Sequence, residues 1–101
     1  MLMKVNYPIY IPSKGRAEKC ITADMLLNDD IDFKIVIEEQ DYDSYEKKYG
    51  KNKLLILPFS DLGLGAYPAR NWIKNYAYSK KQKFHWQLDD DLKYLAFYTK
   101  R

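Results

Sequence analysis

Three consecutive aspartates, Asp89, Asp90 and Asp91, stand directly after an apolar and aromatic run at residues 84–88. Asp89 and Asp91 are two residues apart, so an extended backbone directs both side chains to the same side. Two such carboxylates can hold a hard cation, Mn²⁺ or Mg²⁺, and leave coordination positions open for the oxygens of a diphosphate. We therefore expect a metal site at Asp89 and Asp91, with a solvated acidic turn as the alternative.

A second Asp-x-Asp pair, Asp41 and Asp43, has a simpler interpretation. Asp43 and Glu46 have the spacing of a capping box, in which side chains at the start of a helix bond its free N–H groups. Neither aspartate pair fits an EF-hand loop, because such a loop needs a glycine at its sixth position. We expect Asp41 and Asp43 to belong to the start of a helix and not to a metal site.

Charged residues also follow two other apolar runs. Lys14 and Arg16 come after the first run, where they could bind a diphosphate or face solvent as turn residues. Glu38 and Glu39 come after the second run and could accept hydrogen bonds from a base or a ribose. The alternative is that they are solvated, which we expect of Glu39.

A glycine-containing stretch precedes the clearest amphipathic segment. Gly63 and Gly65 form Gly-x-Gly, but Pro68 stands where the dinucleotide fingerprint has its third glycine, so NAD binding is not supported. The glycines either form a flexible connection or let the backbone and Arg70 approach a ligand closely at a helix N-terminus.

Two residues with reactive side chains are expected in the core. His85 alternates with Phe84 and Trp86 in an apolar run, and Cys20 lies on an apolar helical stripe. Packing therefore explains both residues better than ligand binding does. Cys20 is the only cysteine, which excludes an internal disulfide and the usual cysteine-based zinc patterns.

Four short runs typical of strands must position these residues, and three helical segments lie between them. The runs are residues 7–11, 33–37, 54–57 and 84–88. The first helical segment is residues 16–27, with Cys20, Ala23 and Leu27 on one face and Ile21 and Met25 beside it. The second begins at residue 41, carries a packing stripe of Tyr42, Tyr45 and Tyr49, and stops at Gly50. The third is residues 68–81, with an apolar stripe of Ala69, Trp72, Ile73, Tyr76 and Ala77.

The order of these elements is β-α-β-α-β, a glycine loop, and then α-β. This order predicts a single small α/β domain at residues 1–101, Rossmann-like and three-layered, with a mostly parallel sheet of about four strands. Ligands bind beyond the carboxyl ends of such strands, so the polar segments that follow the strands should open on one rim.

The composition is that of a globular protein, with 47% apolar residues and a net charge of +3. The lysines are scattered along the sequence, so the charge favours anionic ligands weakly and does not establish a nucleic-acid partner. The N-terminal residues contain neither the apolar region of a signal peptide nor a membrane span. We expect a soluble cytoplasmic protein with no membrane partner.

Four segments occur in the order YIPSKGRA, VIEEQDYDSY, GLGAYPARNWIKNYA and WQLDDDL. Together they resemble the nucleotide-sugar-binding half of GT-A fold glycosyltransferases. The Ala-Arg-Asn helix followed by Leu-Asp-Asp-Asp is similar to family 2 glycosyltransferases. The opening segment and the glutamates are more similar to the TET/JBP-associated glycosyltransferases, many carried by bacteriophages, which are thought to glycosylate hydroxymethylated bases in DNA.

The resemblance covers about residues 7–92 and implies a metal-dependent glycosyltransferase domain, with Mn²⁺ or Mg²⁺, a UDP-sugar donor and DNA as the acceptor. It also implies the cytoplasm of a bacterium or of a phage-infected cell. By position, Ser13 and Arg16 would lie near the nucleoside and diphosphate, and Glu38 near the base or ribose. Gly65, Arg70 and Asn71 would border the nucleotide pocket. Asp89 and Asp91 would form the Asp-x-Asp pair, with Asp91 the stronger candidate metal ligand.

Related enzymes continue beyond the Asp-x-Asp strand into a half that supplies the acceptor site, whereas this sequence ends at Arg101. We therefore expect donor binding, in a natural miniature, a truncated copy or a fragment, with the catalytic base unassigned. The alternatives are a non-catalytic nucleotide-binding or regulatory module and a small nucleic-acid-binding protein. A homo-oligomer is compatible with each of these functions. The exposed edge of the fourth strand has unpaired backbone groups, and either residues 92–100 or a partner chain could cover it.

Overall fold

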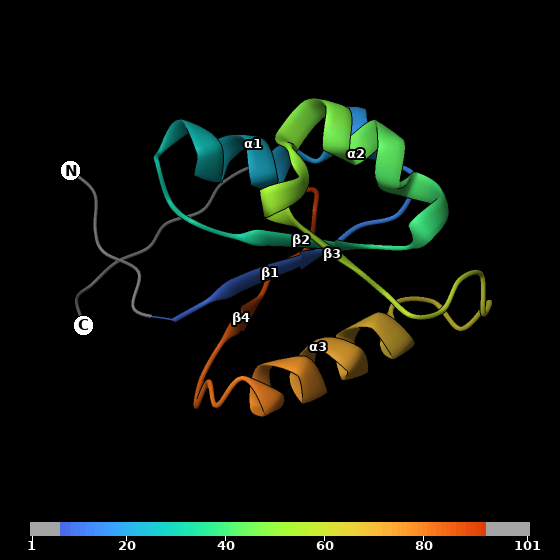
Figure 1. Cartoon of the computed structure of the whole chain (residues 1–101). Coiled ribbons are helices and arrows are strands. Elements are labelled where there is room, and N and C mark those ends of the chain that lie inside the picture. Colours follow the sequence, from blue (N-terminus) through green and yellow to red (C-terminus); the bar gives the residue numbers. More distant parts are fainter. Residues whose placement is uncertain (1–6, 93–101) are drawn as a thin grey trace.

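Four parallel strands form the central sheet of the protein in a computed structural model that describes residues 7–92 (Figure 1). The strands are β1 (Ile9–Pro12), β2 (Lys34–Ile37), β3 (Leu54–Ile56) and β4 (Trp86–Gln87). Their order across the sheet is β3-β2-β1-β4, and every neighbouring pair is parallel. The predicted parallel α/β architecture is therefore confirmed.

Helices cover both faces of this sheet. Helix α1 (Ile21–Asn28) and helix α2 (Tyr42–Tyr49) lie over one face, and helix α3 (Tyr67–Ser79) lies over the other, which makes three layers (Figure 1). Short 3₁₀ helices, η1 (Ala17–Lys19), η2 (Glu39–Asp41) and η3 (Lys51–Lys53), lie in the connections. The chain runs outward from β1 to β3 on the first face and returns to β4 on the second, so the sheet has its topological switch point between β1 and β4.

The alternation of side chains along the strands divides the core between the two faces. In β1, Ile9 and Ile11 belong to the cluster beneath α1 and α2, whereas Tyr10 belongs to the cluster beneath α3. The first cluster includes Leu26 of α1 and Tyr45 of α2. The stripes predicted for the second and third helices are confirmed, because Tyr45 is fully buried and Ile73, Ala77 and their half-buried neighbours pack against the sheet.

The first helix is shorter than predicted and buries a different face. Residues 16–27 were expected to form one helix, but η1 and α1 are separate and Cys20 lies between them, buried as expected. The buried residues of α1 are Thr22, Ala23 and Leu26, whereas Ile21 and Leu27 are exposed. The predicted face was wrong because the helix begins only at Ile21, where contacts to distant residues fix its start.

The fourth strand is also shorter than predicted and is not buried. Among residues 7–92 it pairs only with β1, so it lies at the edge of the described sheet, and Phe84 and Trp86 are exposed. His85 is half-buried and packs edge-to-face against Tyr10. The segment expected to cover this edge lies, from residue 93, outside the described residues.

The capping box predicted at Asp43 and Glu46 was wrong. Helix α2 begins at Tyr42, and its N-cap, Asp41, makes no capping hydrogen bond. Asp41 instead accepts a hydrogen bond from the Gly15 N–H, at 2.9 Å, and so ties the start of α2 to the turn after β1. Gly15 has a φ of 62°, which favours glycine in this turn.

Candidate functional site

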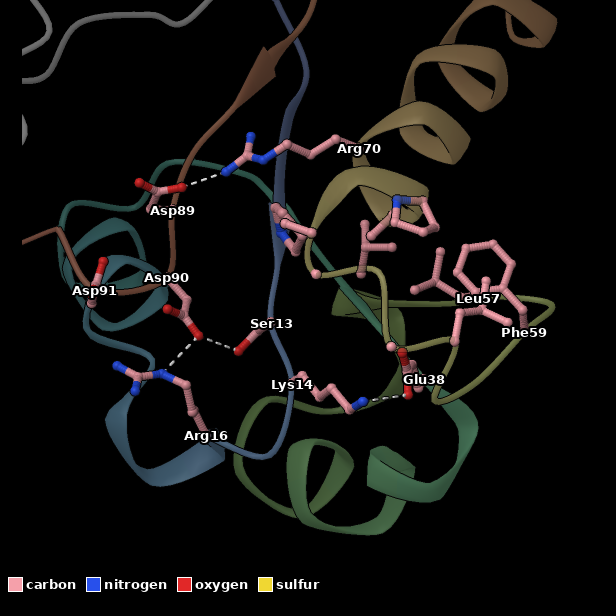
Figure 2. Close-up of a pocket in the computed structure, with 18 residues that line it drawn as sticks. Ser13, Lys14, Arg16, Glu38, Leu57, Phe59, Arg70, Asp89, Asp90 and Asp91 are labelled. Atoms are coloured by element: carbon pink, nitrogen blue, oxygen red, sulfur yellow. Dashed lines mark hydrogen bonds and ion pairs between the residues drawn. The ribbon is translucent and has the colours of Figure 1, made fainter.

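A pocket of about 470 Å³ lies at the carboxyl ends of the strands, beside the switch point between β1 and β4 (Figure 2). It receives residues from the turn after β1, the end of β2, the glycine loop with the first turn of α3, and the segment after β4. The predicted site residues that line it are Ser13, Lys14, Arg16, Glu38, Gly65, Arg70, Asp89 and Asp91. Asn71 lies on the exposed side of α3 and does not line the pocket.

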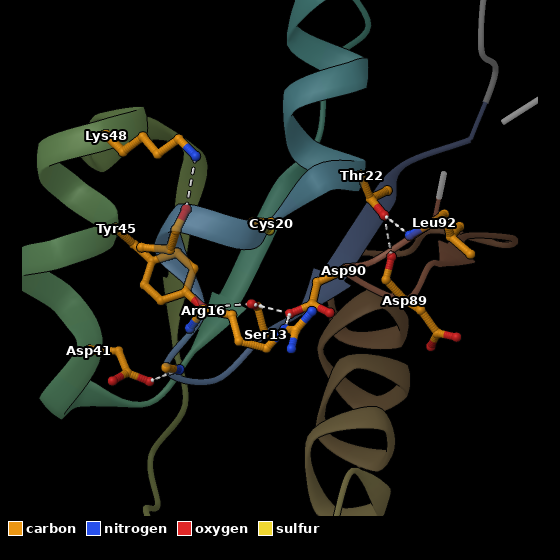
Figure 3. Close-up of polar contacts among 12 residues, drawn as sticks. Ser13, Arg16, Cys20, Thr22, Asp41, Tyr45, Lys48, Asp89, Asp90 and Leu92 are labelled. Carbon is orange, nitrogen blue, oxygen red and sulfur yellow. Dashed lines mark hydrogen bonds and ion pairs between the residues drawn. The ribbon is translucent and has the colours of Figure 1, made fainter. Parts of the chain in front are cut away.

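The middle aspartate of the triplet, Asp90, belongs to a polar network with Ser13 and Arg16 (Figure 3). Asp90 accepts hydrogen bonds from Ser13 Oγ at 2.6 Å and from Arg16 Nε at 3.1 Å. Because the only hydroxyl proton of Ser13 goes to Asp90, the Tyr45 hydroxyl donates to Ser13 Oγ, at 2.6 Å. The Tyr45 oxygen in turn accepts from the Arg16 N–H at 2.9 Å, and burial raises the pKa of Tyr45.

Thr22, at the start of α1, fixes the backbone of the same segment (Figure 3). Its buried hydroxyl donates to the Asp89 carbonyl at 2.5 Å and accepts from the Leu92 N–H at 2.9 Å. The Thr22 N–H donates to the Asp90 carbonyl at 3.1 Å. The first turn of α1 therefore satisfies a free helix N–H with the acidic segment and holds that segment in one conformation.

All three aspartates line the pocket, but these contacts occupy the Asp90 carboxylate and leave the outer two carboxylates outside the network. Asp89 pairs with the Arg70 guanidinium from the first turn of α3. Within residues 7–92, the Asp91 carboxylate is exposed and makes no hydrogen bond or ion pair. Sequence reasoning named Asp89 and Asp91 but missed Asp90, Thr22 and Tyr45. The extended backbone expected at the triplet was wrong, because β4 ends at Gln87 and Asp90 and Asp91 lie in a turn.

The two outer carboxylates are oxygen donors of the kind that Mn²⁺ and Mg²⁺ prefer. In the part of the chain that the structure describes, no three His, Cys, Asp or Glu side chains form a group that could hold a metal ion. Asp89 and Asp91 would therefore supply only part of a coordination shell, and water or phosphate oxygens would complete it. The donor set fits a cation that is shared with an anionic ligand.

Lys14 and Glu38 face each other on another wall of the pocket (Figure 2). Lys14 Nζ lies 3.4 Å from Glu38 Oε1 and donates to Asp61 Oδ1 at 2.7 Å, and this bond raises the pKa of Lys14. Burial opposes ionisation of Glu38, but bonds from Gln40 and the Asp61 N–H, together with Lys14, outweigh it and lower its pKa. Glu38 is therefore an ionised acceptor.

The remaining wall is largely apolar. It consists of Pro12, Val36, Leu57, Phe59, Leu62, Gly63, Gly65, Ala66, Pro68 and Ala69. Gly63 and Gly65 have φ values of 73° and 68°, so the loop takes a backbone path that residues with side chains rarely adopt. An apolar wall opposite charged groups suits a ligand with a flat apolar part and an anionic part.

A Rossmann-like sheet with a polar pocket at its switch point defines a class of α/β proteins that bind ligands at the carboxyl edge. Within this class, residues 7–101 match the family described as TET-Associated Glycosyltransferase, and the chain belongs to that family. No curated protein and no solved structure is significantly similar to it.

Family membership confirms the resemblance inferred from the sequence and gives the protein a glycosyltransferase-related function. Glycosyltransferases in general take a nucleotide-sugar donor and an acceptor. Among residues 7–92, no helix has both the length and the apolar composition needed to cross a bilayer.

Proposed function

We propose that the pocket binds a UDP-sugar together with Mn²⁺ or Mg²⁺, and that the protein takes part in transferring the sugar to hydroxymethylated bases in DNA. The observation that carries this proposal is the charge of the pocket. Its charged lining consists of three basic side chains, Lys14, Arg16 and Arg70, and four carboxylates, Glu38, Asp89, Asp90 and Asp91.

A pocket in which carboxylates outnumber basic groups repels a diphosphate unless a cation is bound with it. Asp89 and Asp91 would hold that cation, which would supply neutralisation of the diphosphate as it leaves the sugar. Metal dependence thus follows from the need to place an anionic ligand beside a cluster of aspartates.

The side chains of this chain have separate tasks in the proposal. Lys14 and Arg70 offer charged donors to phosphate oxygens. Ionised Glu38 can accept from a ribose hydroxyl or a base N–H, and Leu57 and Phe59 offer an apolar surface to the base. Asp90 positions its neighbours through the network that it shares with Ser13 and Arg16.

The proposal is tested by the melting temperature of the full chain with UDP and UDP-sugars, with and without Mn²⁺. A ligand that binds only the folded state at about 100 times its dissociation constant adds about 2.7 kcal/mol of stability. We expect a rise in melting temperature only when nucleotide and cation are both present, and its loss in Asp91→Asn. Asp43→Asn, in the other Asp-x-Asp pair, is the matched control and should keep the rise.

No rise at millimolar UDP-sugar with Mn²⁺, or equal behaviour of the two variants, would contradict donor binding at this site. Transfer is tested separately, by mass spectrometry of hydroxymethylated DNA after incubation with the donor. A rise in melting temperature without sugar transfer would favour the non-catalytic nucleotide-binding module over the enzyme.

A further inference from the structure

The segment that forms one face of the molecule contains no acidic residue. Residues 62–88 include the glycine loop, α3 and the turn into β4, and they carry five basic side chains, Arg70, Lys74, Lys80, Lys81 and Lys83. Every acidic residue of the chain lies in residues 18–61 or 89–91. Within residues 7–92, α3 is the helix that covers this face of the sheet, so the separation along the sequence becomes a separation in space (Figure 1).

The lysines of this segment are unpaired. Within the described residues, Lys74, Lys80, Lys81 and Lys83 form no ion pair. On the opposite face, two lysines form ion pairs: Lys48 Nζ lies 3.4 Å from Asp24 Oδ1, and Lys53 Nζ lies 2.8 Å from Asp32 Oδ1. Lys47 on that face forms no ion pair with a described residue, but acidic residues surround it in the sequence, whereas residues 62–88 contain none. The lysines around α3 therefore keep their charge available for a partner outside the chain.

The outer face of α3 offers hydrogen-bond donors and flat rings beside these charges. Tyr67 and Tyr78 are 73% and 83% exposed, and Asn71, Lys74 and Asn75 are exposed between them. Tyrosine, asparagine and lysine side chains are common donors to phosphate oxygens, and exposed aromatic rings can stack on bases. The exposed residues of α3 itself include no aliphatic side chain that a membrane-binding helix would insert into lipid, and the exposed leucines of this segment, Leu62 and Leu64, lie in the loop before the helix.

The turn after α3 keeps a lysine where glycine is preferred. The helix ends in a Schellman motif, in which the Gln82 N–H bonds the Ala77 carbonyl at 3.0 Å and Lys81 adopts a φ of 61°. A side chain in this left-handed conformation costs about 1 kcal/mol relative to glycine. Lys81 also lines a hollow of about 510 Å³ with Tyr78, Ser79, Gln82 and Lys83.

We propose that the α3 basic surface, defined as Tyr67, Asn71, Lys74, Asn75, Tyr78, Lys80, Lys81 and Lys83, binds the phosphodiester backbone of a nucleic acid. An α-helix of this length extends about 20 Å, so the surface can follow several phosphates of one strand. The hollow at Lys81 lies at the C-terminal end of α3, whereas the pocket begins at its N-terminal end. None of the residues of this surface lines the pocket, although Tyr67 and Asn71 adjoin residues that do. Binding at this surface does not depend on the nucleotide-sugar function.

The test is fluorescence anisotropy of the full chain with a labelled DNA duplex of about 20 base pairs, between about 20 and 200 mM KCl. Single-stranded DNA and duplex RNA of equal length identify which nucleic acid is preferred. We expect binding that weakens steeply with salt. Lys81→Gly should reduce the affinity about five- to tenfold at low salt and lower the salt slope by about 1.

Lys81→Gly removes the charge and relieves the backbone strain, so a loss of binding cannot be attributed to misfolding. Lys47→Ala on α2, which removes the same charge from an exposed residue of the opposite face, is the matched control and should leave the affinity unchanged. The Lys81→Gly variant should still show the rise in melting temperature with UDP-sugar and Mn²⁺. A variant that loses nucleic-acid affinity but keeps this rise would show that the surface and the pocket act separately.

Three results would overturn the proposal. One is the absence of binding to any of the nucleic acids at about 20 mM KCl. Another is an equal loss of affinity in Lys47→Ala and Lys81→Gly, which would show attraction to net charge alone. The third is binding to vesicles of phosphatidylserine and phosphatidylcholine without binding to nucleic acid, which would assign the surface to a membrane.

Discussion

The face of the sheet beneath α1 and α2 and the face beneath α3 differ in packing, in polar contacts and in charge. Within residues 7–92, the first face buries a cluster of eleven residues, and the second buries five. Tyr45, the largest fully buried side chain, belongs to the first face and bonds the turn that lines the pocket. The first face therefore supports the site, and the second presents a helix whose outer surface is free to contact a partner.

The polar contacts follow the same division. On the first face, Lys48 Nζ donates to the Ala17 carbonyl at 2.9 Å and the Tyr49 hydroxyl donates to Asp24 at 2.7 Å, so that α2, η1 and α1 are tied together. The pKa of Tyr49 is raised, first by burial and then by its hydrogen bond to Asp24. The comparison indicates that the two layers can respond separately to mutation.

The largest effect is expected from Ile73→Ala, which removes the fully buried side chain that α3 contributes to the smaller cluster. Such truncations cost about 2–5 kcal/mol. Lower global stability speeds amide hydrogen exchange throughout the protein. If the two faces are independent, exchange in α3 should quicken by more than this general change, whereas exchange in α1 and α2 should not. Urea denaturation gives the loss of stability, and Leu26→Ala on the other face is the matched control.

Leu26→Ala should give the reverse pattern, with faster exchange in α1 and α2. Equal acceleration of exchange in all three helices by Ile73→Ala would contradict the independence of the two faces, because the two clusters would then unfold as one unit.

The next effect in size is expected from Tyr45→Phe, which removes the hydroxyl between Ser13 and Arg16. It leaves a buried serine oxygen and a backbone N–H without their partner, at a cost of about 1–3 kcal/mol. Tyr42→Phe is the control, because the Tyr42 hydroxyl makes no hydrogen bond within the described residues and its ring also packs on the larger cluster. Denaturant midpoints measure the difference, and equal midpoints would argue that the network contributes nothing to stability.

The order of elements and the helix stripes could be predicted because they depend on local pattern. The third helix has a helix-start signal, Pro68 in its first turn, and its apolar stripe lies within one continuous segment of the sequence. The face of α1 could not be predicted in this way, because its eight residues are too short to define a stripe. Its start is set by the bonds from Thr22 to Asp89, Asp90 and Leu92, about 70 residues away in the sequence.

The site shows the same limit. Residue types and strand order predicted which segments meet at the carboxyl edge of the sheet, because this follows from parallel topology. The inward direction of Asp90 follows from Ser13 and Arg16, which are distant in sequence. The triplet lies beyond the end of β4, and Asp90 and Asp91 form a turn, so strand alternation does not give their directions. The positioning role of Asp90 could therefore not be predicted from the triplet itself.

A smaller effect, of opposite sign, is expected from Lys81→Gly on the α3 face. Glycine adopts the left-handed conformation without the strain of a side chain, so the variant should gain about 0.5–1 kcal/mol of stability. Lys80→Gly is the control: Lys80 does not have a positive φ, so glycine there should destabilise. Thermal denaturation checks both, and a loss of stability in Lys81→Gly would show that the lysine side chain is held by contacts within the chain.

The smallest effect is expected at the ion pairs that distinguish the first face. The hydrogen bond from Lys53 lowers the pKa of Asp32. A depressed carboxyl pKa adds stability above the unfolded pKa of about 3.9, and this contribution is lost as pH falls through the folded pKa. Because the Asp32 side chain is 91% exposed, solvent screening limits the contribution to less than about 1 kcal/mol.

Asp32→Asn should therefore be slightly less stable than the unmodified chain at neutral pH, and the difference should vanish in strong acid. Asp29→Asn, at the C-terminus of α1, is the control and should not destabilise, because a negative charge is unfavourable there. Urea midpoints across the acid range measure both variants. A stability difference between Asp32→Asn and the unmodified chain that persisted below the folded pKa would mean that Asp32 acts through packing. The ion pair with Lys53 would then neutralise charge without stabilising the fold.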